Sequence, residues 1–265
     1  MKVFIRGTGD VGSAVAVLLV QAGFLVAMHE DSLPSVTRRG MAFADAVFNG
    51  TATLADHSAR CVRTADHLLR VMASNEIPIA FGPFEIFINA TDWHALIDAR
   101  MRKRAVPERQ RGLAPLVIGL GPNFVVDDNV DLAIETAWGD RLGAVVTVGA
   151  PQPLNGEPQE IGGVARQRYV YAPAAGRFET SMRIGEHVEQ GDVVATISGV
   201  PLHAPFGGTI RGLTHDGVDV SLRTKVIEVD PRGNPASSFG LGVRPQRIAE
   251  GVVRALGDAR ISADA

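Results

Sequence analysis

A glycine-rich stretch near the N-terminus has the spacing of an anion-binding loop. It consists of Gly7, Thr8, Gly9, Asp10, Val11 and Gly12. We expect Gly7 to allow a tight turn with positive φ and Gly9, which has no Cβ, to let a phosphate approach the backbone. Gly12 would let a helix lie close to a strand. The N-terminus of that helix would present unpaired N–H groups and partial positive charge to an anion.

The segments around this loop predict a strand, a helix and a second strand. Residues 2–6 and 24–28 are short and apolar, and residues 13–22 are apolar on nearly every helical face. Glu30 follows the second strand, so the order is that of a dinucleotide-binding βαβ unit. Glu30 would accept hydrogen bonds from a ribose diol and repel a 2′-phosphate, which favours NAD(H) over NADP(H).

Asp10 supports an alternative interpretation of the same loop. Its carboxylate can occupy the helix N-terminus as a capping residue would, and it would repel a pyrophosphate placed there. The alternative is therefore a Rossmann fold whose nucleotide site has been modified or lost.

Other charged residues suggest weaker site hypotheses. Asp98 and Arg100 follow an apolar segment, where they would hold a pterin or a phosphate, or else form a structural ion pair. Arg38 and Arg39 would meet a ligand phosphate or lie in a solvated loop. His57 and Cys61 are spaced for a metal only on a helix, and that segment predicts a strand, so we expect no metal site.

Composition limits the class of protein. The chain has 265 residues, a formal net charge of −3 and no basic stripe, so nucleic acid is not an expected partner. No apolar run reaches the length that spans a membrane, and no signal peptide is expected. A single cysteine, Cys61, excludes an intrachain disulfide and favours a cytoplasmic protein.

Three regions are predicted along the chain. Residues 1–155 form an α/β sheet domain with six or seven strands, in which residues 93–96 read as a helical turn and Pro78 marks a sheet edge or a strand end. Residues 164–232 are rich in short strands and turns. Residues 233–265 contain a final amphipathic helix, expected at residues 244–256, and a tail.

The second region contains an internal repeat with a spacing of 32 residues, from Ala172 to Ala204. The pairs in phase are Ala172-Pro173 with Ala204-Pro205, Phe178 with Ile210, Gly185 with Gly217, Val188 with Val220, Val194 with Val226, and Ile197 with Val229. Two β units of this size would share one core. Arg223 departs from the pattern, because the repeat places a glycine there to match Gly191.

This repeat resembles the biotinyl/lipoyl-attachment domains, which are small barrel-sandwich folds made of two related halves. That resemblance implies a modified lysine at the hairpin that joins the halves. Here the hairpin, residues 198–203, has no lysine, and Lys225 is predicted on a strand. We therefore expect no covalent biotin or lipoate.

A wider resemblance covers essentially the full length. It is carried by GTGDVGSAVAVLLVQAGFLVAMHE, TRRGMAFADAVFNG, IDARM, APLVIGLGPNF, AIETAWGDRLGAVV, NGEPQEIGG, the APxxG repeat and DPRG. Together these segments are similar to the maturation proteins of selenium-dependent molybdenum hydroxylases. The resemblance implies a cytoplasmic accessory role in assembling the molybdenum cofactor or its sulfido or selenido ligand, with an immature molybdenum hydroxylase as partner.

The expected protein is thus a Rossmann-like domain joined to a lysine-free barrel-sandwich domain and a C-terminal helix. It would bind NAD or a molybdopterin dinucleotide through Gly7, Thr8, Gly9, Asp10, Gly12, Glu30, Asp98 and Arg100. The sequence favours a non-enzymatic accessory protein and leaves homo-oligomerisation open. An NAD-dependent oxidoreductase and a ligand-sensing regulatory module are the alternatives, and no catalytic Lys, His or Tyr motif supports the first.

Overall fold

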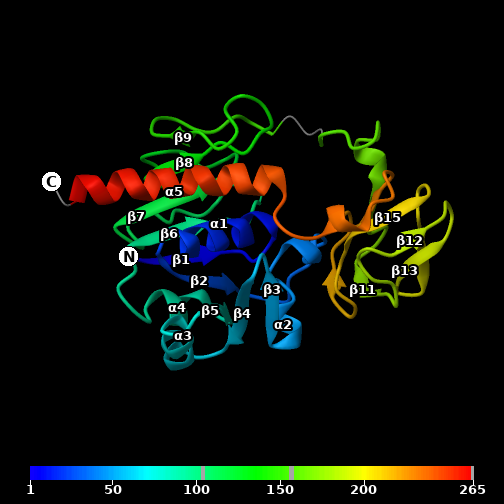
Figure 1. Cartoon of the computed structure of the whole chain (residues 1–265), viewed down its shortest axis with the longest axis horizontal. Helices are drawn as coiled ribbons and strands as arrows, with labels where there is room; N and C mark the ends of the chain where they lie inside the picture. Colours follow the sequence, from blue (N-terminus) through cyan, green and yellow to red (C-terminus); the bar gives the residue numbers. More distant parts are fainter. Residues whose placement is uncertain (103–104, 155–157, 264–265) are drawn as a thin grey trace.

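The computed structural model describes residues 1–102, 105–154 and 158–263 and has a mixed α/β architecture (Figure 1). Residues 1–146, here called the nine-stranded region, contain a nine-stranded, mostly parallel sheet. Two four-stranded antiparallel sheets form the double-sheet region, residues 169–230. A long C-terminal helix returns from the double-sheet region to the nine-stranded one. The predicted fold class is confirmed at this level.

The strands of the nine-stranded sheet are β1 (Lys2–Arg6), β2 (Leu25–Glu30), β3 (Thr51–Leu54), β4 (His57–Val62), β5 (Glu76–Phe81), β6 (Ala95–Asp98), β7 (Leu116–Leu120), β8 (Leu132–Ile134) and β9 (Val145–Val146). The double sheets contain β10 (Tyr169–Tyr171), β11 (Gly176–Glu179), β12 (His187–Val188), β13 (Val193–Ile197), β14 (Val200–His203), β15 (Gly208–Leu213), β16 (Asp219–Val220) and β17 (Lys225–Asp230).

The α-helices are α1 (Asp10–Gln21), α2 (Ala46–Asn49), α3 (Ala65–Met72), α4 (Phe84–Ile88) and α5 (Val243–Ala263). Short 3-10 turns are η1 (Arg39–Met41), η2 (Arg166–Arg168) and η3 (Pro235–Ser238). Thr64 caps α3, because its hydroxyl accepts a hydrogen bond from the His67 amide at 3.2 Å.

The nine-stranded sheet has the order β3-β4-β5-β2-β1-β6-β7-β8-β9. The strands from β4 to β8 pair in parallel, whereas β3 and β9 run antiparallel to their neighbours. Both faces are covered, which explains the continuous apolar composition of β1. Val3 and Ile5 share a core with α1 and α5, and Phe4 points to the opposite core with α3 and α4.

Three expectations about this sheet are wrong. Residues 93–96 do not form a helical turn, because Ala95–Asp98 pairs with both β1 and β7. Pro78 lies neither at an edge nor at a strand end, because β5 runs from Glu76 to Phe81 between β4 and β2. The sheet has nine strands rather than six or seven, since β3 and β9 are short and add only antiparallel edges. In all three cases, the structure is determined by pairing between strands that are distant in sequence.

The double-sheet region shows the repeat in its strand pairing. One sheet has the order β10-β17-β15-β12 and the other β14-β13-β11-β16, so each half lends one short strand to the sheet of the other. Gly176 pairs with Val220 as Gly208 pairs with Val188, and both pairs keep the 32-residue spacing. The eight apolar repeat positions lie in one core, namely Phe178, Val188, Val194, Ile197, Ile210, Val220, Val226 and Val229.

Arg223, which departs from the repeat, has the backbone conformation of the glycine expected at its position. Arg223 has φ of 64° and Gly191 has φ of 90°, so both occupy the left-handed region that favours glycine. Lys225 lies on β17, as predicted, and its ammonium is held 3.1 Å from Glu228. The hairpin between β13 and β14 turns at Ser198 and Gly199, both with positive φ.

The two regions are joined by direct contacts as well as by the chain. The Leu213 amide donates to the Thr37 carbonyl at 2.8 Å, and the Phe48 and His215 rings stack with centroids 3.8 Å apart. The C-terminal helix α5 lies along α1 (Figure 1). A Cβ at Gly251 would lie 2.2 Å from the Gly143 carbonyl oxygen, so the helix approaches this loop as closely as its backbone allows.

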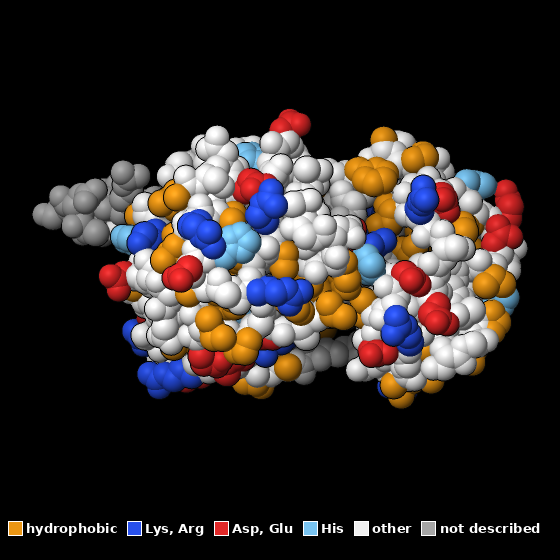
Figure 2. All heavy atoms as spheres, turned by 90° about the horizontal axis from the view of Figure 1, so that it is seen from below, with side chains coloured by type: hydrophobic (Ala, Val, Ile, Leu, Met, Phe, Trp, Pro, Cys, Tyr) orange, Lys and Arg blue, Asp and Glu red, His pale blue; other side chains and the backbone are white. Residues whose placement is uncertain are grey.

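On the face shown in Figure 2, basic and acidic side chains are interspersed rather than gathered in a band of one sign. Among the residues that the structure describes, no helix is both long and apolar enough to cross a bilayer.

Candidate functional site

The glycine loop leaves β1 and enters α1 at the carboxyl edge of the sheet. Gly7 has φ of 100°, and a Cβ there would lie 3.0 Å from the Arg100 Cα. A Cβ at Gly12 would lie only 2.2 Å from the Gly7 carbonyl oxygen. The predicted roles of these two glycines, a tight turn and close helix packing, are confirmed.

Gly9 differs because its surroundings are open. The nearest side-chain atom to a Cβ there would be a Val36 methyl carbon at 3.8 Å. Gly9 is the N-cap of α1 and makes no side-chain capping bond, but the Asp10 carboxylate accepts a hydrogen bond from the Val11 amide at 3.0 Å and so occupies part of the first turn, as the alternative interpretation expected. Ser13 donates to the Gly9 carbonyl as the first intrahelical bond, so the amides of Gly9, Asp10 and Gly12 have no acceptor among the described residues. Gly9 and Asp10 are partly exposed, so their amides can meet an anion, whereas Gly12 is buried.

Glu30, at the end of β2, fixes the position of the glycine loop through hydrogen bonds. One of its carboxylate oxygens, Oε1, accepts hydrogen bonds from the Thr8 amide and from the Thr8 hydroxyl, both at 2.7 Å. Burial raises the pKa of Glu30, and the Thr8 hydrogen bonds only partly oppose that shift. The expected contact between Glu30 and a ribose diol stays a prediction. Because Thr8 already donates two hydrogen bonds to Oε1, the ribose would bind mainly to Oε2.

Asp10 is paired with a cation, which bears on its predicted repulsion of a pyrophosphate. Arg38 Nη1 donates to Asp10 Oδ2 at 3.2 Å, while Arg38 Nε and Nη2 donate to the two oxygens of Glu228, each at 3.0 Å. Arg39 donates to the Leu213 carbonyl at 2.8 Å. The interpretation of Arg38 and Arg39 as a solvated loop is therefore wrong, because both bridge to the double-sheet region.

Glu228 is the centre of this junction. Its side chain is 0% exposed, and it also accepts from Arg168 Nε at 3.2 Å and Lys225 Nζ at 3.1 Å. Burial alone would raise the pKa of Glu228, but Lys225 and Arg38 outweigh it and lower the pKa well below its ordinary value. The carboxylate is thus ionised and accepts hydrogen bonds from three cations, and the Nε of a fourth, Arg211, lies 3.7 Å from Glu228 Oε1.

Sequence reasoning missed Glu228 and Arg168, although a signal was present. The segment from Lys225 to Asp230 reads KVIEVD, which places an acid within an apolar strand. A buried acid must either become neutral or pair with a cation to stay ionised, so this acid points to a cation pair as one of two outcomes without identifying the cation.

Asp98 and Arg100 are brought together at the end of β6. Asp98 accepts from Arg100 Nε at 3.0 Å, from the Arg100 amide at 3.1 Å and from Gln110 Nε2 at 2.7 Å. Asp98 is 1% exposed. The ion-pair alternative is confirmed, and binding of a pterin or phosphate stays a prediction. Because Gly7 packs on the Arg100 backbone, this pair adjoins the glycine loop.

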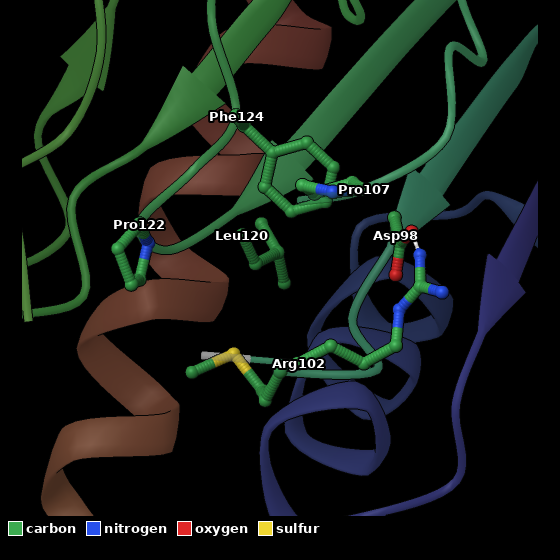
Figure 3. A pocket seen from close by; sticks show the side chains of 7 residues that line it. Asp98, Arg102, Pro107, Leu120, Pro122 and Phe124 are labelled. Carbon is green, nitrogen blue, oxygen red and sulfur yellow. Dashed lines mark ion pairs between the residues drawn. The ribbon is translucent and has the colours of Figure 1, made fainter. Parts of the chain in front are cut away.

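A narrow hollow lies beside Asp98 (Figure 3). The Arg102 side chain reaches toward Asp98 there, with a nitrogen–oxygen distance of 3.6 Å, and Phe124 and Pro107 lie over it. The hollow has no room for a water molecule between its described residues. The glycine loop and Glu30 do not line it, so an anion at the loop would not occupy this hollow.

Cys61 and His57 do not form a site in the described residues. Burial raises the pKa of the Cys61 thiol, which keeps it protonated at neutral pH. The His57 ring lies 3.5 Å from the Gln21 side chain. Within the described part of the chain, no three side chains of His, Cys, Asp or Glu gather as metal ligands would.

Comparison with known proteins finds one informative similarity. The chain is 35% identical, over 254 residues that make up 96% of its length, to the uncharacterized protein YqeB of Escherichia coli (strain K12). Those residues cover 47% of YqeB, so the chain spans about half the length of this relative. No family model matches the chain, and no solved structure matches it.

Proposed function

We propose that the chain is an accessory protein for the maturation of molybdenum hydroxylases, which binds a nucleotide or a molybdopterin-type dinucleotide at its glycine loop. The observation that carries the binding proposal is the first turn of α1, where Gly9 is approachable and the partly exposed amides of Gly9 and Asp10 lack acceptors among the described residues. A helix N-terminus of this kind favours the phosphates of a dinucleotide. The maturation role rests on the sequence resemblance.

The sheet order supports a Rossmann-like description of the nine-stranded region. The run β5-β2-β1-β6-β7-β8 reverses direction along the chain at β1, and ligands of doubly wound sheets bind outside the carboxyl ends of the strands at such a point. The glycine loop leaves β1 there. In the double-sheet region, two halves that exchange one strand and share one core support a barrel-sandwich description.

Arg38 couples the two regions in this proposal. It contacts Asp10 in the first turn of α1 and Glu228 in the double-sheet region. A bound phosphate would compete with Asp10 for the Arg38 nitrogen, and Arg38 would offset the repulsion between Asp10 and the phosphate. The double-sheet region would thus contribute to binding through Arg38.

A thermal-shift screen of the full chain tests the binding proposal. The ligands are NAD, NADP, ATP, CTP, FAD and molybdopterin dinucleotides. A ligand present at about a hundred times its Kd adds roughly 2.7 kcal/mol of stability. The Gly9→Val variant should lose the response because the side chain would cover the amides. The matched control is Gly257→Val, since Gly257 also has open surroundings and lies on α5, away from the loop.

A pull-down with an immature molybdenum hydroxylase tests the partner. Capture that rises with the stabilising dinucleotide is expected. Absence of any ligand response together with absence of capture would refute the proposal. Hydride transfer with NAD(H) would instead favour an oxidoreductase.

A further inference from the structure

A second set of cations lies beside the glycine loop and converges on one carboxylate. Arg6 is the last residue of β1, and Arg100 and Arg102 follow β6. Glu108 Oε1 accepts from Arg6 Nη1 at 2.7 Å and from Arg100 Nη2 at 2.6 Å, and Glu108 Oε2 accepts from Arg102 Nη2 at 2.5 Å. Three guanidinium groups therefore bind a single two-oxygen group.

The arginines are positioned by contacts that do not involve Glu108. The Arg6 guanidinium stacks on the Phe84 ring, 3.9 Å from its centroid, and donates to Gln110 at 3.1 Å. Arg100 is held by Asp98 through its Nε. The Arg6 side chain is 7% exposed, and its buried Nε has no hydrogen-bond partner among the described residues. Such preorganised donors are typical of a binding site.

Glu108 is the peripheral member of the cluster. Its side chain is 45% exposed and lies on the connection between β6 and β7, outside the sheet. Water reaches the Glu108 carboxylate, so this group can be solvated when a competing anion takes its place on the arginines. Asp98, in contrast, is buried and remains in place.

The number and charge of the donors favour a phosphoryl group over a carboxylate. Glu108 must share one oxygen between Arg6 and Arg100, whereas a tetrahedral phosphoryl group offers one oxygen to each guanidinium. Without Glu108, three positive charges face Asp98 and, at the rim, the half-exposed Asp31, which lies 3.7 Å from Arg6 Nη2. The remaining positive charge requires an anion, and the number of guanidinium donors favours a phosphoryl group.

We propose that Arg6, Arg100 and Arg102 form a phosphoryl-binding site, and that Glu108 is an internal occupant which the ligand displaces. The site takes inorganic phosphate or the terminal phosphoryl group of a phosphate ester. It uses side chains rather than the amides of α1, so it does not rest on the proposed function.

Calorimetric titration of the full chain with inorganic phosphate, and separately with a nucleoside monophosphate, tests the site at constant ionic strength. Glu108→Gln should bind phosphate roughly five- to tenfold more tightly than the wild type, because the competing charge is removed. Adding Arg102→Met to Glu108→Gln should abolish the gain, and Arg102 is exposed enough that this change should leave the fold intact. Glu76→Gln, which breaks the Arg60–Glu76 pair elsewhere on the sheet, is the matched control and should leave affinity unchanged.

The outcomes separate this site from the glycine loop. The gain in Glu108→Gln should persist when Gly9→Val is added, even if the dinucleotide response is lost. Tighter binding of the monophosphate than of phosphate would identify a ligand-borne group, and equal binding would identify the free ion. A Glu108→Gln variant that binds both no more tightly than the wild type would overturn the proposal.

Discussion

Glu228 and Glu108 are each bound by three cations, yet their surroundings differ. Glu228 lies within β17 with no exposed side-chain surface, and Arg38 reaches it from the other region of the molecule. Glu108 lies on a connecting segment and is nearly half exposed. Because water screens the second group and not the first, similar pairing should stabilise the junction at Glu228 and leave Glu108 replaceable by a ligand.

The largest expected difference is in stability. Glu228→Gln leaves Arg38, Arg168 and Lys225 near one another without their carboxylate, and removing one partner from a buried ion pair costs about 3–5 kcal/mol. Glu108→Gln should cost about 1 kcal/mol or less. Urea unfolding of both variants, followed by circular dichroism, measures the two values. Equal losses would remove the distinction between the clusters.

The next largest expected effect is on the way the free energy of unfolding changes at acid pH. The folded-state pKa of Glu228 is lowered from 4.5, so its contribution is fully present above pH 4.5 and is lost as the pH falls toward the folded value. Asp230, whose pKa is lowered to about 2 because hydrogen bonds from Arg232 outweigh burial, loses its contribution between pH 3.8 and about 2.

Wild-type unfolding free energy should therefore fall as the pH drops below 4.5, and the fall should be smaller in Glu228→Gln. Thermal unfolding measured between pH 7 and pH 3 gives both curves. Parallel curves for the two proteins would show that folding does not shift the pKa of Glu228.

A third carboxylate, Glu30, provides the contrast of a buried acid held by neutral donors. Its pKa is raised, so the folded protein binds this proton more tightly than the unfolded chain, and stability falls as the pH rises above 4.5. Glu30→Gln keeps an acceptor for Thr8 without the charge. The variant should be as stable as the wild type or up to about 1 kcal/mol more stable at pH 7, with a smaller difference at pH 4. A large loss at pH 7 would mean that a cation balances Glu30.

Local features of the sequence predicted the parts of the fold that depend on local geometry. The turn at Gly7, the packing at Gly12 and the repeat of the double-sheet region all follow from residue types at fixed spacing. Even Arg223 fits, because the repeat required a left-handed residue at its position.

Contacts between residues distant in sequence cannot be predicted from these local features. Residues 93–96 were assigned to a helical turn because a four-residue strand has too little periodicity to identify, and its partners β1 and β7 are distant in sequence. The pairing of Arg38 with Glu228 joins residues 190 positions apart. The buried acid in β17 points to a cation pair as one of two outcomes, but no local pattern distinguishes Arg38 from the other arginines.

The position of α5 has a consequence for biosynthesis. Its apolar residues complete the core over α1, which the first residues of the chain begin. A ribosome adds about 5–20 residues per second and releases N-terminal segments first, so α1 emerges long before the helix that covers it. The nascent sheet therefore exposes apolar surface until α5 has been synthesised and has packed over α1.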